Sequence, residues 1–111
     1  MTDDYTNAPT ARDDELDLLA CVLMGWDPTD VDLKPDEFDQ PKHETVWKAM
    51  LTVAQSGGVP DTSSVRLALG SEGDKAATWL LEVFGRPVAP ANAPAFAARI
   101  RRAHQLRSIM E

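Results

Sequence analysis

The sequence predicts an all-α protein, a small orthogonal bundle of helices that ends in a long C-terminal helix. Three observations support this fold class. Apolar residues recur at intervals of three and four in five segments, no segment alternates apolar and polar residues, and clusters of proline or glycine separate the segments. A chain of 111 residues with 43% hydrophobic and 26% charged residues has the composition of one folded domain with a single modest core.

The first helix is predicted between an acidic cap, Asp13 or Asp14, and a stop at Gly25. Residues 1–12 contain a proline and small polar side chains and predict a flexible acidic tail, so a single helical domain is expected over residues 13–111. The apolar stripe of this helix is wide, which predicts nearly complete burial; its members are Leu16, Leu18, Leu19, Ala20, Val22 and Leu23. Cys21 lies inside the stripe and is expected to pack as a small buried side chain.

Residues 26–41 are rich in proline and acidic side chains, which predicts a loop with at most one turn of helix around Pro35 to Phe38. The next helix is expected from Lys42 to about Ser56, and the glycine pair that follows stops it. A shorter helix should then begin at a cap provided by Ser63 or Ser64.

Two further helices complete the chain. Asp74 is expected to cap a helix that ends at Gly85, and Asn92 to cap a helix that begins at Ala93 and reaches the C-terminus. The predicted buried side of the first is Ala77, Leu80, Leu81 and Phe84, and the apolar stripe of the second is Phe96, Ile100, Ala103, Leu106 and Met110. Leu106, Ile109 and Met110, at the end of the second helix, are expected to be exposed to water. The apolar faces that must meet predict a core built on Leu19, Leu23, Val46, Met50, Leu80, Phe84 and Ile100.

The net charge of -7 is unevenly distributed. The first forty residues are strongly acidic, whereas the last part of the chain carries Arg86, Arg99, Arg101, Arg102 and Arg107. An acidic chain without a long basic stripe does not bind duplex DNA tightly, because phosphate neutralisation supplies most of that affinity. The arginines are expected either to form a solvated helix face or to meet an acidic protein surface.

Motifs that carry chemistry are missing from the sequence. It has no GxxxxGK[ST], GxGxxG, HExxH or GxSxG run, and His43 and His104 lie far apart without clustered ligands. We therefore expect no enzymatic activity, no cofactor and no metal. His43 falls in the first turn of its helix without a neighbouring serine or cysteine to activate, which favours a packing or hydrogen-bonding role.

The order of several weaker motifs resembles the N-terminal domain of the DnaB-type replicative DNA helicases. In that family an acidic-aromatic turn and a proline precede a histidine that opens a helix, with an aromatic residue one turn later; Phe38, Pro41, His43 and Trp47 occupy these places. A glycine, an apolar-Pro-Asp run and a Ser or Thr cap follow in the family, and residues 58–62 match them. A long arginine-bearing helix, residues 93–110 here, completes a resemblance that covers residues 14–110.

Three departures from the family pattern stand out. The family's first helix usually carries a glutamate followed by small residues and a glycine pair; here Leu18 to Cys21 replace much of this pattern, and only Gly25 ends the helix. The later aromatic-leucine helix lacks a preceding glycine pair. The family's last helix is normally half of a hairpin that leads to a linker and a motor domain. We expect the second hairpin helix and the motor domain to be absent, so that the chain is either an excised domain or a complete protein made of this module.

The resemblance implies a non-catalytic assembly and partner-docking module of the replication machinery, as in the helicase collar that supports ring assembly and primase docking. One alternative is a stand-alone phage- or plasmid-type adaptor or decoy that binds a host helicase, loader or primase. Another is the helicase-interacting C-terminal region of a primase. A small DNA-binding regulator is the candidate from outside replication, and the acidic charge argues against it.

The expected partners are replication proteins and, weakly, a second copy of the chain. Residues expected to bind a partner or to self-associate are Arg99, Arg102, Leu106, Ile109 and Met110, and residues expected to be structural are Phe38, His43 and Trp47. The N-terminal residues lack the basic and apolar regions of a signal peptide, and no apolar run is long enough for a membrane span. A cytoplasmic location is the resulting expectation.

Overall fold

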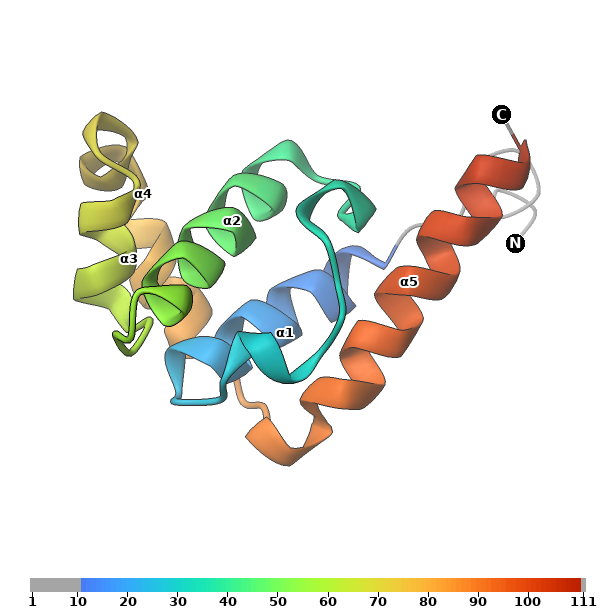
Figure 1. Ribbon diagram of the computed structural model, residues 1–111, viewed down its shortest axis with the longest axis horizontal. Coiled ribbons are helices and arrows are strands. Elements are labelled where there is room, and N and C mark those ends of the chain that lie inside the picture. The colour runs from blue at the N-terminus through green and yellow to red at the C-terminus, as the bar shows by residue number, and fades with distance from the viewer. Residues whose placement is uncertain (1–10, 111) are drawn as a thin grey trace.

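Every regular element in the part of the chain that the structure describes is a helix (Figure 1), so the all-α prediction is confirmed. The computed structural model describes residues 11–110. For Met110 it describes the backbone, which is part of the last helix, and not the side chain. The α-helices are α1 (Arg12–Leu23), α2 (Pro41–Gln55), α3 (Thr62–Ala68), α4 (Ser71–Phe84) and α5 (Ala93–Met110). Three short 3-10 turns, η2 (Pro28–Asp30), η3 (Pro35–Glu37) and η4 (Pro90–Asn92), lie between them. The expected tail falls largely on residues 1–10, which lie outside this description.

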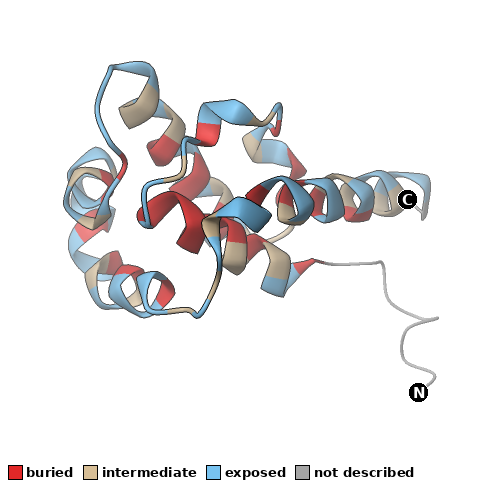
Figure 2. Cartoon of the chain, turned by 90° about the horizontal axis from the view of Figure 1, so that it is seen from below, coloured by how far each residue is buried: buried red, intermediate tan, exposed pale blue. Residues whose placement is uncertain are grey.

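Helix α1 is the centre of the bundle. It packs against α2, α4 and α5, while α3 packs against α2 and α4 (Figure 1). The domain measures 41 × 27 × 25 Å, with α3 and α4 at one end of its long axis and the end of α5 at the other. Figure 2 shows the buried residues gathered in the middle of the molecule.

Burial around α1 is nearly complete, as its wide apolar stripe predicts. Residues 18–23, including Cys21, are all buried. A stretch of helix that is apolar on every side, as residues 18–23 are, has to be enclosed on every side, and the three neighbouring helices provide this enclosure. The remaining core comes from one face of each neighbour, including Val46, Met50 and Ile100.

The buried face of α4 differs from the predicted one. Leu80 is 1% exposed as expected, but Leu81 and Phe84 are 61% and 47% exposed. The helix carries two apolar stripes, and the stripe turned toward the core also contains Ala76 and Val83. The prediction was wrong because Leu81 and Phe84 form an apolar stripe that periodicity alone cannot distinguish from the core-facing one.

Three helix starts also differ from the predicted caps. Helix α1 begins at Arg12, so Asp13 and Asp14 lie in its first turn and do not cap it. The cap of α3 is Asp61, whose carboxylate accepts a hydrogen bond from the Ser64 amide at 2.8 Å while the Ser64 hydroxyl accepts one from the Asp61 amide at 2.9 Å. Asp61 has the extended backbone that a cap needs, whereas Ser64 is already helical.

Helix α4 begins at Ser71, before the predicted cap Asp74, because Gly70 turns the chain with a φ of 64° that other residues rarely adopt. Asp74 instead binds Arg66 of α3 at 2.6 Å. Gly73 allows the two helices to approach closely, since a Cβ atom there would collide with the backbone carbonyl of Arg66.

At the last helix, Asn92 ends η4, which runs directly into α5.

A buried carboxylate joins α1 to the start of α2. The Glu15 side chain is completely buried, and its two oxygens accept hydrogen bonds from the backbone amides of Asp39 at 2.8 Å and Gln40 at 3.4 Å. The Nδ1 atom of His43 lies 2.7 Å from Glu15 Oε1. These three contacts fix the end of the loop and the first turn of α2 on the surface of α1.

Aromatic side chains hold the same region from two sides. The His43 ring stacks on Trp79 of α4, with a centroid distance of 5.8 Å, and the Lys42 ammonium lies 4.4 Å from the centre of the Trp79 ring. Trp47 is fully buried, packs against Phe38 and donates its indole N–H to the Leu33 carbonyl at 2.9 Å. The indole thereby anchors the extended segment between the two 3-10 turns of the long loop.

No helix in residues 11–110 is both long and apolar enough to cross a membrane.

The two adjacent leucines of α4 allow a matched test of the core. We expect Leu80→Ala to lower the free energy of unfolding by about 2–5 kcal/mol, because it removes a fully buried side chain. Leu81→Ala should cost less than about 1 kcal/mol, because most of Leu81 is already in water. Urea denaturation of both variants measures the difference, and equal losses would contradict this orientation of α4.

Glu15→Gln tests the buried carboxylate. We expect the free energy of unfolding to fall by about 1.5–3 kcal/mol, because the new amide group turns a donor toward a backbone N–H or toward His43. Glu82→Gln, the same change at an exposed site of α4, should cost less than about 0.5 kcal/mol. Urea denaturation followed by tryptophan fluorescence compares the two variants, and a Glu15→Gln protein as stable as the original chain would refute the role of this carboxylate.

Candidate interaction surfaces

Most of the C-terminal arginines face acidic residues of the same chain. Arg86 binds Asp17 at 2.8 Å, and Arg99 binds Asp14 at 2.8 Å. These pairs join residues that are 69 and 85 positions apart and fasten the chain after α4, and α5 itself, to α1. Much of the opposite charge at the two ends of the sequence therefore forms ion pairs within the domain.

Two further arginines of α5 hold the acidic loop. Arg101 forms two hydrogen bonds to Glu37, at 2.9 and 3.3 Å, and Arg107 lies 3.6 Å from the Asp39 carboxylate and donates to the Glu37 carbonyl. Burial alone would raise the pKa of Glu37, but hydrogen bonds from Arg101 and the Lys34 amide outweigh it and hold this pKa below its ordinary value. Glu37 is thus held as a carboxylate, and it organises η3 by accepting from Lys34.

The residues expected to bind partners lie on α5 in different environments. Arg99 is half-exposed but bound to Asp14, while Arg102 is exposed. Leu106 is partly buried, and Ile109 is 79% exposed. The side chain of Met110 lies outside the described part of the chain. The contacts of Arg101 and Arg107 with the loop keep the second half of α5 against the domain.

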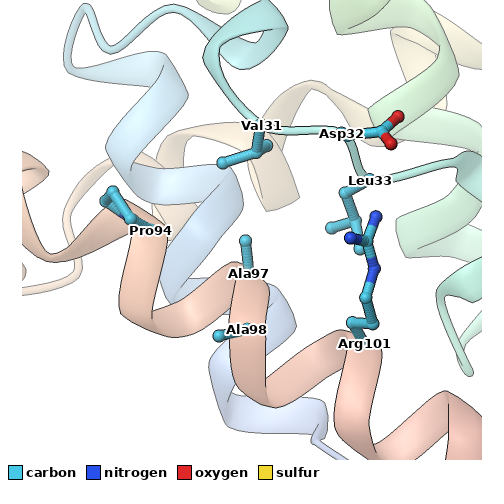
Figure 3. Close-up of a pocket in the computed structure, with 7 residues that line it drawn as sticks. All are labelled: Val31, Asp32, Leu33, Pro94, Ala97, Ala98 and Arg101. Carbon is cyan, nitrogen blue, oxygen red and sulfur yellow. The ribbon is translucent and has the colours of Figure 1, made fainter.

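A shallow groove opens between α5 and the extended segment that joins η2 to η3 (Figure 3). Val31 and Leu33 form one wall, and the small residues of α5 form the other. Asp32 and Arg101 lie at its edge, and the complete lining is Val31, Asp32, Leu33, Pro94, Ala97, Ala98 and Arg101. We call this feature the loop-α5 groove. Its volume of about 190 Å³ is below the range of small-molecule sites, so it fits one or two side chains of a larger partner.

Exposed apolar side chains also occur on α3 and α4. Leu67 of α3 and Leu81 of α4 are largely exposed, and Phe84 of α4 is about half-exposed. A shallow hollow between the two helices is lined by Ala77 and Leu81 together with the Arg66 side chain. Nothing in this region gathers charge of one sign, because Arg66 is neutralised by Asp74.

No three His, Cys, Asp or Glu side chains among the described residues are placed to hold a metal ion. Burial, aided by the negative charge of Asp17, raises the pKa of the Cys21 thiol to about 11, so this side chain stays protonated at neutral pH. Its sulfur donates weakly to the Ala89 carbonyl, at 3.7 Å. His43 is committed to Glu15 and Trp79 in the interior.

The sequence did not lead us to single out Glu15, although its side chain is the most deeply buried polar one among the described residues. A signal was present, because Glu15 precedes Leu18 and Leu19 by three and four positions and so lies on the apolar face of α1. An acidic residue in line with a buried stripe requires donors from elsewhere in the fold. Those donors come from residues 39, 40 and 43, and their identity emerges only from the structure.

Comparisons with known proteins agree with this architecture. The family profile of the DnaB-like helicase N-terminal domain matches residues 7–102. Among solved structures, the crystal structure of the N-terminal domain of DnaB helicase from Mycobacterium tuberculosis has a TM-score of 0.82 and 24% sequence identity, over 94% of this chain and 79% of that one. A comparison with curated proteins gives no match. Since the profile covers most of the residues, the chain belongs to the family of DnaB-like helicase N-terminal domains.

Proposed function

We propose that this domain is a non-catalytic assembly and docking module of the DNA replication machinery, acting in the cytoplasm. The observation that carries the proposal is the family match over residues 7–102, together with a fold of the same architecture. The arrangement of side chains supports a binding role, because the polar groups of the interior are engaged in holding helices together. The partners we propose are a helicase, a primase or a helicase loader.

Self-association is the second part of the proposal. Ile109 projects into water near the end of α5, Leu106 is partly exposed, and Arg102 carries a charge on the same helix. An exposed apolar side chain rimmed by cations is a ready contact for another protein surface. We propose that Arg99, Arg102, Leu106, Ile109 and Met110 contribute to such contacts, in a weak two-fold dimer or with a replication partner.

Capture of purified partners tests the docking function. We expect the immobilised chain to retain the replicative helicase, its loader or the primase of its native host, and an Arg102→Glu, Ile109→Asp variant to retain at least about tenfold less. Gln105→Glu, at another exposed position of α5, serves as the control and should bind like the original chain. If none of these three proteins is retained, or if the purified chain hydrolyses ATP, the proposed function is wrong.

Light scattering of the isolated chain tests self-association separately. We expect the mean mass to rise toward that of a dimer as the concentration approaches about 1 mM, the range of weak contacts. Ile109→Asp and Leu106→Asp should abolish the rise, because they place a charge in the apolar contact, and Met110→Asp should weaken it. Gln105→Asp should leave it unchanged. A monomeric mass for the original chain at every concentration would exclude the dimer.

A further inference from the structure

The walls of the loop-α5 groove are mainly apolar and leave room for a side chain. Ala97 and Ala98 present only methyl groups on the α5 side, while Val31 faces them from the extended segment (Figure 3). Leu33, which also lines the groove, is buried, and its backbone carbonyl accepts a hydrogen bond from the Trp47 indole. An apolar side chain that entered the groove would be shielded from water on both sides.

The rim of the groove is negatively charged. Asp32 lies at the edge of the groove, and Asp30 and Asp36 are exposed just before and after the segment that forms one wall, against one exposed cation on that segment, Lys34. Arg101, the other cation at the groove, already forms two hydrogen bonds to Glu37. An anionic ligand would therefore meet three nearby carboxylates against the single exposed cation Lys34, whereas lysine or arginine side chains would be attracted.

From this complementarity we infer that the loop-α5 groove binds a segment of a partner protein in which an apolar side chain is flanked by lysine or arginine residues. The inference rests on the proposed docking function and specifies the chemistry of the partner. The apolar side chain enters between Val31 and Ala98, and its cationic neighbours lie along Asp30, Asp32 and Asp36. The acidic rim also disfavours nucleic acid as an occupant, because phosphates would be repelled.

A second copy of the chain fits this groove less well. Its exposed apolar residue nearest the cations of α5 is Ile109, and in the described part of the chain Arg86, Arg99, Arg101 and Arg107 are already bound to acidic residues. Arg102 would then provide most of the charge, opposite three carboxylates. A dedicated basic segment of another protein offers more cations for the same contact.

Titration of the isotope-labelled full chain with three synthetic peptides tests the inference by NMR. The probes are GKKLLKKG, its acidic counterpart GEELLEEG and the non-apolar GKKGGKKG, all with blocked ends. We expect only GKKLLKKG to give saturable shifts at the amides of Val31, Leu33 and Ala98. Binding of GKKGGKKG with equal affinity, shifts centred elsewhere, or no saturation below about 1 mM would overturn the inference.

Matched variants separate groove binding from general attraction between charges. Ala98→Leu fills the groove and should weaken binding of GKKLLKKG at least about tenfold, whereas Ala95→Leu, at an exposed position of α5 outside the groove, should change it less than about twofold. Asp32→Asn should weaken binding more than Glu82→Gln, an exposed acid on α4. If Ala98→Leu and Ala95→Leu behave alike, or if the groove amides shift with protein concentration alone, as a second copy in the groove would cause, the inference fails.

Failure of the groove inference can be distinguished from failure of the proposed docking function. If Ala98→Leu still captures the replication partners as the original chain does, the groove is not their docking site while the docking function stands. If the chain captures no replication protein but GKKLLKKG binds the groove, the proposed function fails and the chemistry assigned to the groove stands.

Discussion

The fold depends on the fully buried carboxylate of Glu15. Glu15 lies in the first turns of the most enclosed helix, where an isolated charge would be very costly. Backbone amides of Asp39 and Gln40 and the ring of His43 surround it, and all three belong to the junction between the long loop and α2. This carboxylate needs hydrogen-bond donors, and supplying them fixes where the loop ends and in which direction α2 runs away from α1. Trp79 then stacks on His43 and extends the same constraint to α4.

The charge of the chain contributes to its architecture in a second way. Acidic residues near the N-terminal side pair with arginines near the C-terminal side, so that α5 is held to α1 by Asp14 and to the loop by Glu37. Exposed pairs of this kind contribute little energy individually, but they select the orientation in which the apolar faces meet. Asp30, Asp32 and Asp36 remain exposed on the loop, and they give one side of the loop-α5 groove its excess of negative charge.

The sequence was sufficient to predict the helices, the burial of α1 and the resemblance to the family. It was insufficient wherever two helix faces or two capping residues fitted the local pattern equally well. Leu81 continues the apolar pattern of α4 as well as Leu80 does, and only packing against α1 decides between their faces. Ser64 and Asp61 are both good caps, and the extended backbone of Asp61 decides between them. The donors to Glu15 and the partners of the arginines are distant in sequence, so local patterns hold no information about them.

The pairing of α1 with α5 joins the first and last helices of the domain. Contacts between α3 and α4 close only a short loop, whereas those between α1 and α5 link residues as far apart as Asp14 and Arg99. During synthesis the apolar surface of α1 therefore stays partly exposed until residues 93–110 have left the ribosome, because α5 is the helix that covers most of it. Closure of so long a loop also adds entropy cost to the folding barrier. The helix that forms the centre of the finished domain is thus the one most exposed to misassociation while the chain is incomplete.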